Sequence, residues 1–148
     1  MNARDELSPL TEDLLAAADS EKARRLGIGG LLDVLVSRPG ERPEDVLLDL
    51  RLADDRDLAL ALALRSGRPF EGLRDFAPDH RLFLYVPLHV AQRERIVPLV
   101  MIGDRLKIAT VYLDPDLDFV RSRFPSLGID LVLAPRGEVL EALQRVGA

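Results

Sequence analysis

The sequence has 148 residues, a formal net charge of −5 and no cysteine, and 47% of its residues are hydrophobic. This length suits one domain or two small subdomains, and the apolar fraction suffices for a core of ordinary size. The acidic balance and the lack of a basic run argue against nucleic-acid partners and against an anionic membrane surface. No apolar stretch approaches the roughly 20 residues that span a bilayer, and the N-terminus lacks the apolar core of a signal peptide. We therefore expect a cytoplasmic chain without disulfides and without direct membrane insertion.

The first part of the chain is predicted to be helical. Ser8-Pro9 can cap and open a helix that runs to about Leu26, where Gly27 can end it. Residues 28–36 have the apolar spacing of a short amphipathic helix, which Pro39-Gly40 stops. Pro43 and the acidic residues after it open a further helix, which is expected to bury Val46, Leu47 and Leu50.

Residues 58–64 alternate leucine with alanine, a pattern that a strand could also show. We predict a helix, because Ala and Leu are strong helix formers and Ser66-Gly67 supplies a stop. As a helix this segment is apolar nearly all round. It should therefore be central to the core or covered by a partner.

The rest of the chain reads as a mixture of strands and helices. An extended connector over residues 68–76 is anchored by Phe70 and Leu73, and short helices start at Pro78 and Pro87. The β-branched run at residues 96–101 and the strand at residues 106–113 flank a Gly103-Asp104 turn, which indicates a hairpin with Ile108 in the core.

Asp114-Pro115 has the signature of a helix start, with the Asp as cap and the Pro at the first helical position. Residues 129–133 form a third predicted strand, and residues 136–146 a closing helix. The predicted fold is α+β, a helical N-terminal subdomain followed by a small three-stranded mixed β-sheet packed with helices. The predicted boundary divides residues 1–68, the helical subdomain, from residues 69–148, the α/β subdomain.

Motifs for catalysis and for metal binding are missing from the sequence. There is no P-loop motif and no G-x-G-x-x-G after a strand. The glycines at residues 27, 29 and 30 follow a predicted helix, so helix-end geometry is preferred over a phosphate site. His80 and His89 lack metal-ligand spacing. The acidic group at residues 54–57 lacks the pattern of a calcium loop, and we interpret it as a helix start. We expect no catalytic residue and no bound metal.

Short patterns from about residue 46 to residue 146 resemble, in their order and spacing, the N-terminal domain of the ATPases that power type II secretion and type IV pilus assembly. These patterns are Leu58-x-x-x-Leu62-Ala63, Gly67-x-Pro69-Phe70-x-x-Leu73, Ile96-x-Pro98-Leu99, Leu106-x-Ile108-Ala109, Asp114-Pro115-x-x-x-Phe119 and Val132-x-Ala134-Pro135. The resemblance implies a helical bundle joined to a small α/β unit. Members of that family usually continue into a P-loop ATPase.

The resemblance implies two functions. Many members of the family dock on an inner-membrane platform protein and tether the motor ATPase to its machine. Others bind cyclic di-GMP through two tandem copies of a motif that resembles R-L-G-x-x-L-x-x-x-G-x-x-x-x-x-x-L-x-x-x-L-x-x-Q. The residues of this chain that the second function would use as ligand-binding residues are Arg25, Arg42, Leu47, Arg51, Leu58, Leu62 and Arg65.

The cyclic di-GMP motif is degenerate in this chain. In the second copy Arg42 and three leucines match, but the family's Leu, Gly, Gly and Gln are replaced at the positions of Pro43, Glu44, Arg51 and Arg65. Losing the glycines places side chains where a ligand would meet bare backbone. The first copy is too short, because Arg42 follows Arg25 by only 17 positions.

We therefore predict a non-catalytic docking and regulatory domain that binds the platform protein and has no cofactor. It would be cytoplasmic, and peripheral at the inner membrane only through its partner. The alternative is a cyclic di-GMP receptor. An independent enzyme is the third class, and it would require a nucleophile or metal site that the sequence does not show.

Overall fold

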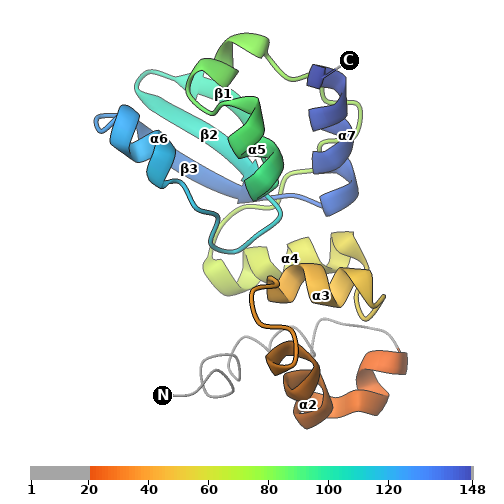
Figure 1. Cartoon of the computed structure of the whole chain (residues 1–148). Coiled ribbons are helices and arrows are strands. Elements are labelled where there is room, and N and C mark those ends of the chain that lie inside the picture. The colour runs from red at the N-terminus through yellow and green to blue at the C-terminus, as the bar shows by residue number, and fades with distance from the viewer. Residues whose placement is uncertain (1–20, 148) are drawn as a thin grey trace.

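A computed structural model describes residues 21–147 of the chain. The N-terminal part of the described chain is helical, with α2 (Glu21–Val36), α3 (Pro43–Asp49) and α4 (Asp55–Ser66). These helices lie together at one end of the molecule, and the sheet lies at the other end (Figure 1). The predicted helix from Ser8 falls mostly outside the described residues.

The ends of these helices follow the local signals in the sequence. Gly27 has a φ of 66° and breaks α2 into two helical pieces, as its position after the first predicted helix suggested. Asp54 caps α4 by accepting hydrogen bonds from the backbone N–H groups of Arg56 and Asp57. Gly67, with a φ of 71°, ends the same helix in the left-handed conformation. The prediction of a helix over residues 58–64 is therefore confirmed, and the acidic group before it is a helix start.

The C-terminal part contains a 3-10 helix, η1 (His80–Leu84), followed by α5 (Leu88–Glu94) and the hairpin of β1 (Ile96–Ile102) and β2 (Arg105–Thr110). After the hairpin come α6 (Asp118–Arg123), β3 (Gly128–Leu133) and α7 (Arg136–Gly147). The strand order is β1-β2-β3, with an antiparallel β1–β2 pair and a parallel β2–β3 pair. The α+β fold class with a three-stranded mixed sheet is confirmed.

The prediction of a helix at Asp114-Pro115 is wrong. Strand β2 ends at Thr110, not Leu113, and α6 begins only at Asp118. The backbone between them is bound from outside: the N–H of Leu113 donates to Glu44, and the N–H of Asp116 donates to Glu94. These long-range hydrogen bonds tie the segment to α3 and to the end of α5 in a non-helical conformation.

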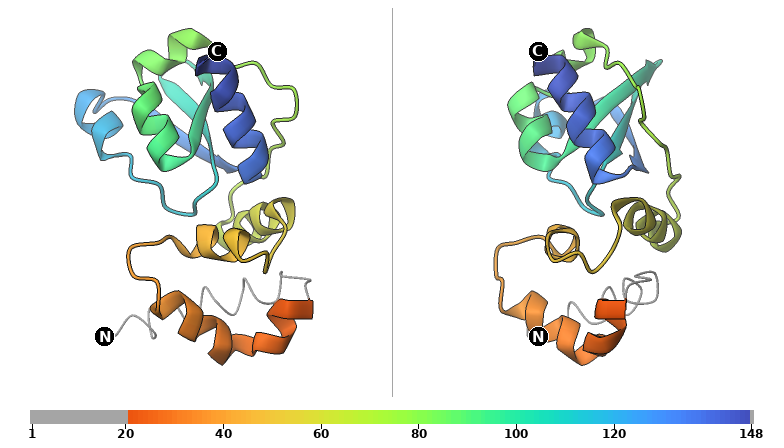
Figure 2. Two further views of the ribbon diagram at one scale, coloured as in Figure 1. Left: turned by 45° about the vertical axis from the view of Figure 1, so that its right-hand side comes forward. Right: turned by 90° about the vertical axis from the view of Figure 1, so that its right-hand side faces the viewer.

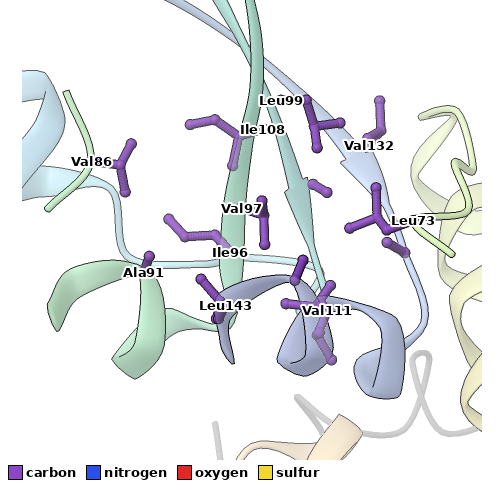
Figure 3. Packing of buried hydrophobic residues seen from close by; sticks show 14 of the residues in the cluster. Leu73, Val86, Ala91, Ile96, Val97, Leu99, Ile108, Val111, Val132 and Leu143 are labelled. Atoms are coloured by element: carbon purple, nitrogen blue, oxygen red, sulfur yellow. The ribbon is translucent and has the colours of Figure 1, made fainter. Parts of the chain in front are cut away.

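Buried side chains form two hydrophobic clusters. The larger surrounds the sheet and includes Ile108, which is fully buried as predicted. In this cluster Val86 and Ala91 lie on one side of the strands and Leu73 on the other (Figure 3). Connector residues therefore cover part of the sheet opposite α5.

The smaller cluster packs α2, α3 and α4 together. Val46 and Leu47 are buried in it, whereas Leu50, which was predicted to be buried with them, is only half-buried at the end of α3. Leu133, at the end of β3, belongs to this helical cluster and so joins it to the sheet. Two further views show the helices packed beside the sheet unit (Figure 2). The subdomain boundary near residue 68 remains a prediction.

Candidate functional site

The seven residues that the cyclic di-GMP motif indicated lie in different surroundings. Three leucines are at most 3% exposed and fill the helical cluster, so they hold α3 and α4 together and do not offer a ligand surface: Leu47, Leu58 and Leu62. Three arginines are exposed on α2, just after α3, and on α4: Arg25, Arg51 and Arg65. Arg42 differs from all of these, because its side chain is bound by the sheet half of the molecule. A ligand-binding role for these residues stays a prediction.

Arg42 lies at the N-cap of α3 and reaches toward the segment that follows β2. Its guanidinium lies 4.1 Å from the centre of the Tyr112 ring, a cation–π geometry. It also donates to the backbone carbonyl of Asp114 at 3.0 Å and forms an ion pair with Glu94. Its charge and its donors are thus used within the chain.

Glu94, the last residue of α5, is a buried carboxylate, and both of its oxygens accept hydrogen bonds. Its side chain is 6% exposed. Besides Arg42, it accepts from the backbone N–H of Asp116 at 2.8 Å and from Nε of Arg93 at 3.1 Å. A buried charge is tolerated when it is paired and hydrogen-bonded in this way.

Glu44 is a second buried carboxylate, in the first turn of α3 and only 5% exposed. It accepts a hydrogen bond from the backbone N–H of Leu113 at 2.8 Å. Burial raises the pKa of Glu44, and the hydrogen bond from Leu113 and the charge of Arg42 oppose this shift. The side chain thus serves to bind α3 to the segment after β2.

Tyr112 links the same two regions from the other side. Its hydroxyl donates to Oδ2 of Asp45 at 2.6 Å, and burial together with this bond raises the pKa of Tyr112 to about 12. Asp45 also pairs with Arg136 at 3.4 Å, and Arg136 pairs with Asp49 at 2.8 Å. We call the residues that join α3 to the sheet half in this way the polar interface: Arg42, Glu44, Asp45, Asp49, Glu94, Tyr112, Leu113 and Arg136.

The sequence indicated Arg42 but missed its partners. The hydrogen bonds of Arg42 to Glu94, of Tyr112 to Asp45 and of Arg136 to Asp45 span 52, 67 and 91 residues. Short sequence patterns cannot predict contacts between residues so far apart in the chain. The available signal was the acidic pair Glu44-Asp45 directly after Pro43, which in the sequence analysis is interpreted as a helix start and, at Glu44, as a lost glycine.

The chemistry of the polar interface is that of attachment. Its two arginines pair with three of its four carboxylates, those of Glu94, Asp45 and Asp49, and it contains no activated nucleophile. Within residues 21–147, no group of three or more metal-ligating side chains is present. His89 instead makes an edge contact with the ring of Phe119, at 6.1 Å between ring centres. Among the described helices, none is long and apolar enough to cross a membrane.

Fold and site together define a small α+β domain whose helical half is fastened to its sheet half by paired side chains. The model of one family, the MshEN domain, matches residues 66–148. The chain therefore belongs to the MshEN domain family, and its resemblance to the N-terminal domains of secretion and pilus ATPases is confirmed. No curated protein matches this chain in sequence.

The chain is similar in fold to solved structures of MshE and of the N-terminal domain of XpsE. The structure of MshE with cdg, cyclic di-GMP, is similar with a TM-score of 0.57 and 20% identity, and the match covers 99% of each chain. The N-terminal domain of XpsE is similar with a TM-score of 0.61 and 21% identity, over 91% of this chain and 94% of that one. A second crystal form of that domain gives 0.58 and 22%, over 98% and 99%. At these identities the similarity establishes the shared fold.

Proposed function

We propose that this chain is a non-catalytic docking and regulatory domain, which attaches a secretion or pilus motor ATPase to an inner-membrane platform protein. Membership of the MshEN family supports the link to such an ATPase. The sequence lacks a P-loop, so ATP chemistry would belong to another part of the motor. On this proposal the domain is peripheral at the inner membrane through its partner.

The observation that carries the proposal is the division of leucines on α4. Leu58 and Leu62 are buried in the helical cluster, whereas Leu60 is 43% exposed and Leu64 87% exposed. Leu60 and Leu64 are four residues apart, so they share one face of the helix. A pair of exposed leucines on a helix whose opposite face is core offers an apolar surface for a partner helix.

The proposal is tested with the purified cytoplasmic domain of the cognate platform protein. The chain should bind it saturably, and Leu64→Glu should weaken the binding about tenfold or more, which is about 1.4 kcal/mol. Leu84→Glu is the matched control, because Leu84 is 77% exposed but lies on η1 in the other half of the molecule. Absence of binding by the folded parent chain would remove the docking function.

A cyclic di-GMP receptor is the second candidate, and the likeness to MshE with cyclic di-GMP is the observation that favours it. Against it stand the internal contacts of Arg42 and the buried carboxylates beside it. A calorimetric titration of the chain with cyclic di-GMP separates the two functions.

A further inference from the structure

Strand β3 is an edge strand, and part of its edge is unpaired. The backbone groups of its even-numbered residues point toward β2. The N–H of Gly128 donates to the backbone carbonyl of Asp104 at 2.8 Å, and the N–H of Ala134, just after the strand, donates to the backbone carbonyl of Thr110 at 3.1 Å. Alternation along a strand then directs the N–H and C=O groups of Ile129, Leu131 and Leu133 to the outer edge.

The connector pairs with this edge at one end only. The N–H of Leu133 donates to the carbonyl of Pro69, and the N–H of Glu71 donates to the carbonyl of Leu133, each at 2.9 Å. These two bonds make a parallel bridge between Phe70 and Leu133. Within the described residues, no backbone partner completes the edge at Ile129 and Leu131.

A hollow of about 590 Å³ lies where the connector leaves the edge. Its walls are the turn at residues 67–69 on one side and residues 129–132 of β3 on the other, with Ile102, Arg105 and Lys107 from the hairpin. The hollow is therefore continuous with the unpaired edge and large enough to admit side chains.

The walls combine apolar side chains with an excess of positive charge. Arg68, Arg105 and Lys107 line the hollow. Arg105 pairs with Asp130 at 2.7 Å, and Lys107 pairs with Glu71 at 2.7 Å. The three cations outnumber these two carboxylates, on a chain with a net charge of −5. The hollow therefore complements an apolar segment that also carries negative charge.

We propose that the free edge of β3 accepts an extended, apolar and acidic peptide segment of a partner protein, which adds a fourth strand to the sheet. Ile129 and Leu131 would supply the backbone hydrogen bonds, and the hollow would take alternate side chains. This surface is separate from the exposed leucines of α4, so it can hold even where the docking proposal fails.

The probe is a synthetic Val-Glu-Val-Glu-Val peptide, acetylated and amidated, titrated into the chain and followed by amide NMR shifts. The expected result is saturable binding with a Kd below about 1 mM and with chemical-shift changes at the amides of Ile129 and Leu131. A peptide with the same side chains and N-methylated alternate amides should bind at least about tenfold more weakly, because it has lost its donors. No saturable shift at these two residues, or equal binding of the methylated peptide, overturns the proposal.

A variant and a second peptide test the geometry and the charge. Ile129→Pro removes an outward N–H while leaving the bonds of β3 to β2 in place, and Gly128 before it tolerates the restriction that Pro imposes. It should abolish binding, whereas Ile129→Val should keep it. Should Ile129→Pro fail to fold, the methylated peptide decides the question on the unmodified chain. A Val-Lys-Val-Lys-Val peptide that binds as well as the acidic one would overturn the charge preference.

Discussion

Glu44 holds a carboxyl group that is almost entirely removed from water, and burial raises its pKa above the ordinary value of 4.5. Between pH 4.5 and the raised value, the folded chain keeps a proton that the unfolded chain has lost. The free energy of unfolding therefore falls through this range as the pH rises. Ionised Glu44 is tolerated at higher pH because Leu113 and Arg42 stabilise it.

Glu44→Gln should remove this pH dependence. The amide oxygen can still accept from Leu113, but the side chain no longer ionises. We expect the free energy of unfolding of the variant, minus that of the parent, to increase as the pH rises above 4.5. Urea unfolding over a pH series measures this difference, and Glu41→Gln, at an exposed position of the same region, is the control. A difference that stays constant or decreases would contradict the assignment.

Arg51 has a φ of 56°, in a region that strains any residue with a Cβ. The cyclic di-GMP motif has a glycine at this position. Arg51→Gly should therefore raise the free energy of unfolding, by about 0.5–1 kcal/mol after the entropy cost of glycine. Arg51→Ala loses the same charge but keeps the strain, so it should show no gain. Equal changes in the two variants, measured by urea unfolding, would count against backbone strain.

The hairpin of β1 and β2 is the element on which the sheet core depends. Ile108 of β2 is fully buried in the larger cluster, whereas Ile102 of β1 is 71% exposed. Ile108→Asp should lower the free energy of unfolding by about 3 kcal/mol or more, because it buries an unpaired charge. Ile102→Asp should stay within about 0.5 kcal/mol of the parent. Thermal and urea unfolding give both values, and an Ile108→Asp variant that melts within a few degrees of the parent would refute this placement of the strand.

Elements with local signals could be predicted from the sequence. The turn at Gly103-Asp104, the helix start in the acidic group at residues 54–57 and the stop at Gly67 each depend on residues a few positions apart, and the structure has all three. The signal at Asp114-Pro115 is equally local, yet it failed. The backbone N–H groups of Leu113 and Asp116 donate to the carboxylates of Glu44 and Glu94, and these long-range bonds outweigh the preference of the sequence for a helix cap.

The polar interface could not be predicted for the same reason. Its residues come into contact only when α3, the end of α5 and the segment after β2 are assembled. The residue spacing within any one of these segments does not predict contacts with the other two. The motif comparison indicated Arg42 as a ligand-binding residue. In the structure its guanidinium contacts Tyr112, Glu94 and Asp114, an arrangement that sequence reasoning on a single segment could not supply.

Across the whole molecule, the polar interface fastens the helical half to the sheet half. Arg42→Ala would leave Glu94 buried with only Arg93 and the N–H of Asp116. We expect a loss of about 2 kcal/mol in the free energy of unfolding. The exposed pair of Arg38 with Glu41 is the control, and Arg38→Ala should cost at most about 0.5 kcal/mol.

Hydrogen exchange can separate coupling between the halves from a general loss of stability. In Arg42→Ala the amides of α3 should exchange faster than in the parent, while those of β2 should change less. A uniform increase over both elements would show that the two halves unfold as one unit and that Arg42 does not control their attachment.

The same contacts bear on the ligand. Bound cyclic di-GMP would bring the negative charge of its phosphates to Arg42. This arginine already pairs with Glu94 and donates to the carbonyl of Asp114, beside the buried Glu44. Opening this arrangement would leave buried carboxylates without their partner, a cost that the ligand would have to offset. We therefore expect no saturable cyclic di-GMP binding by the unmodified chain at about 100 μM ligand. A site with a Kd of about 1 μM, about 8 kcal/mol of binding free energy, would be saturated at that concentration. Calorimetry is the measurement, with MshE as the positive control; saturable heats would mean that Arg42 exchanges its internal partners for the ligand, and the receptor function would then replace docking.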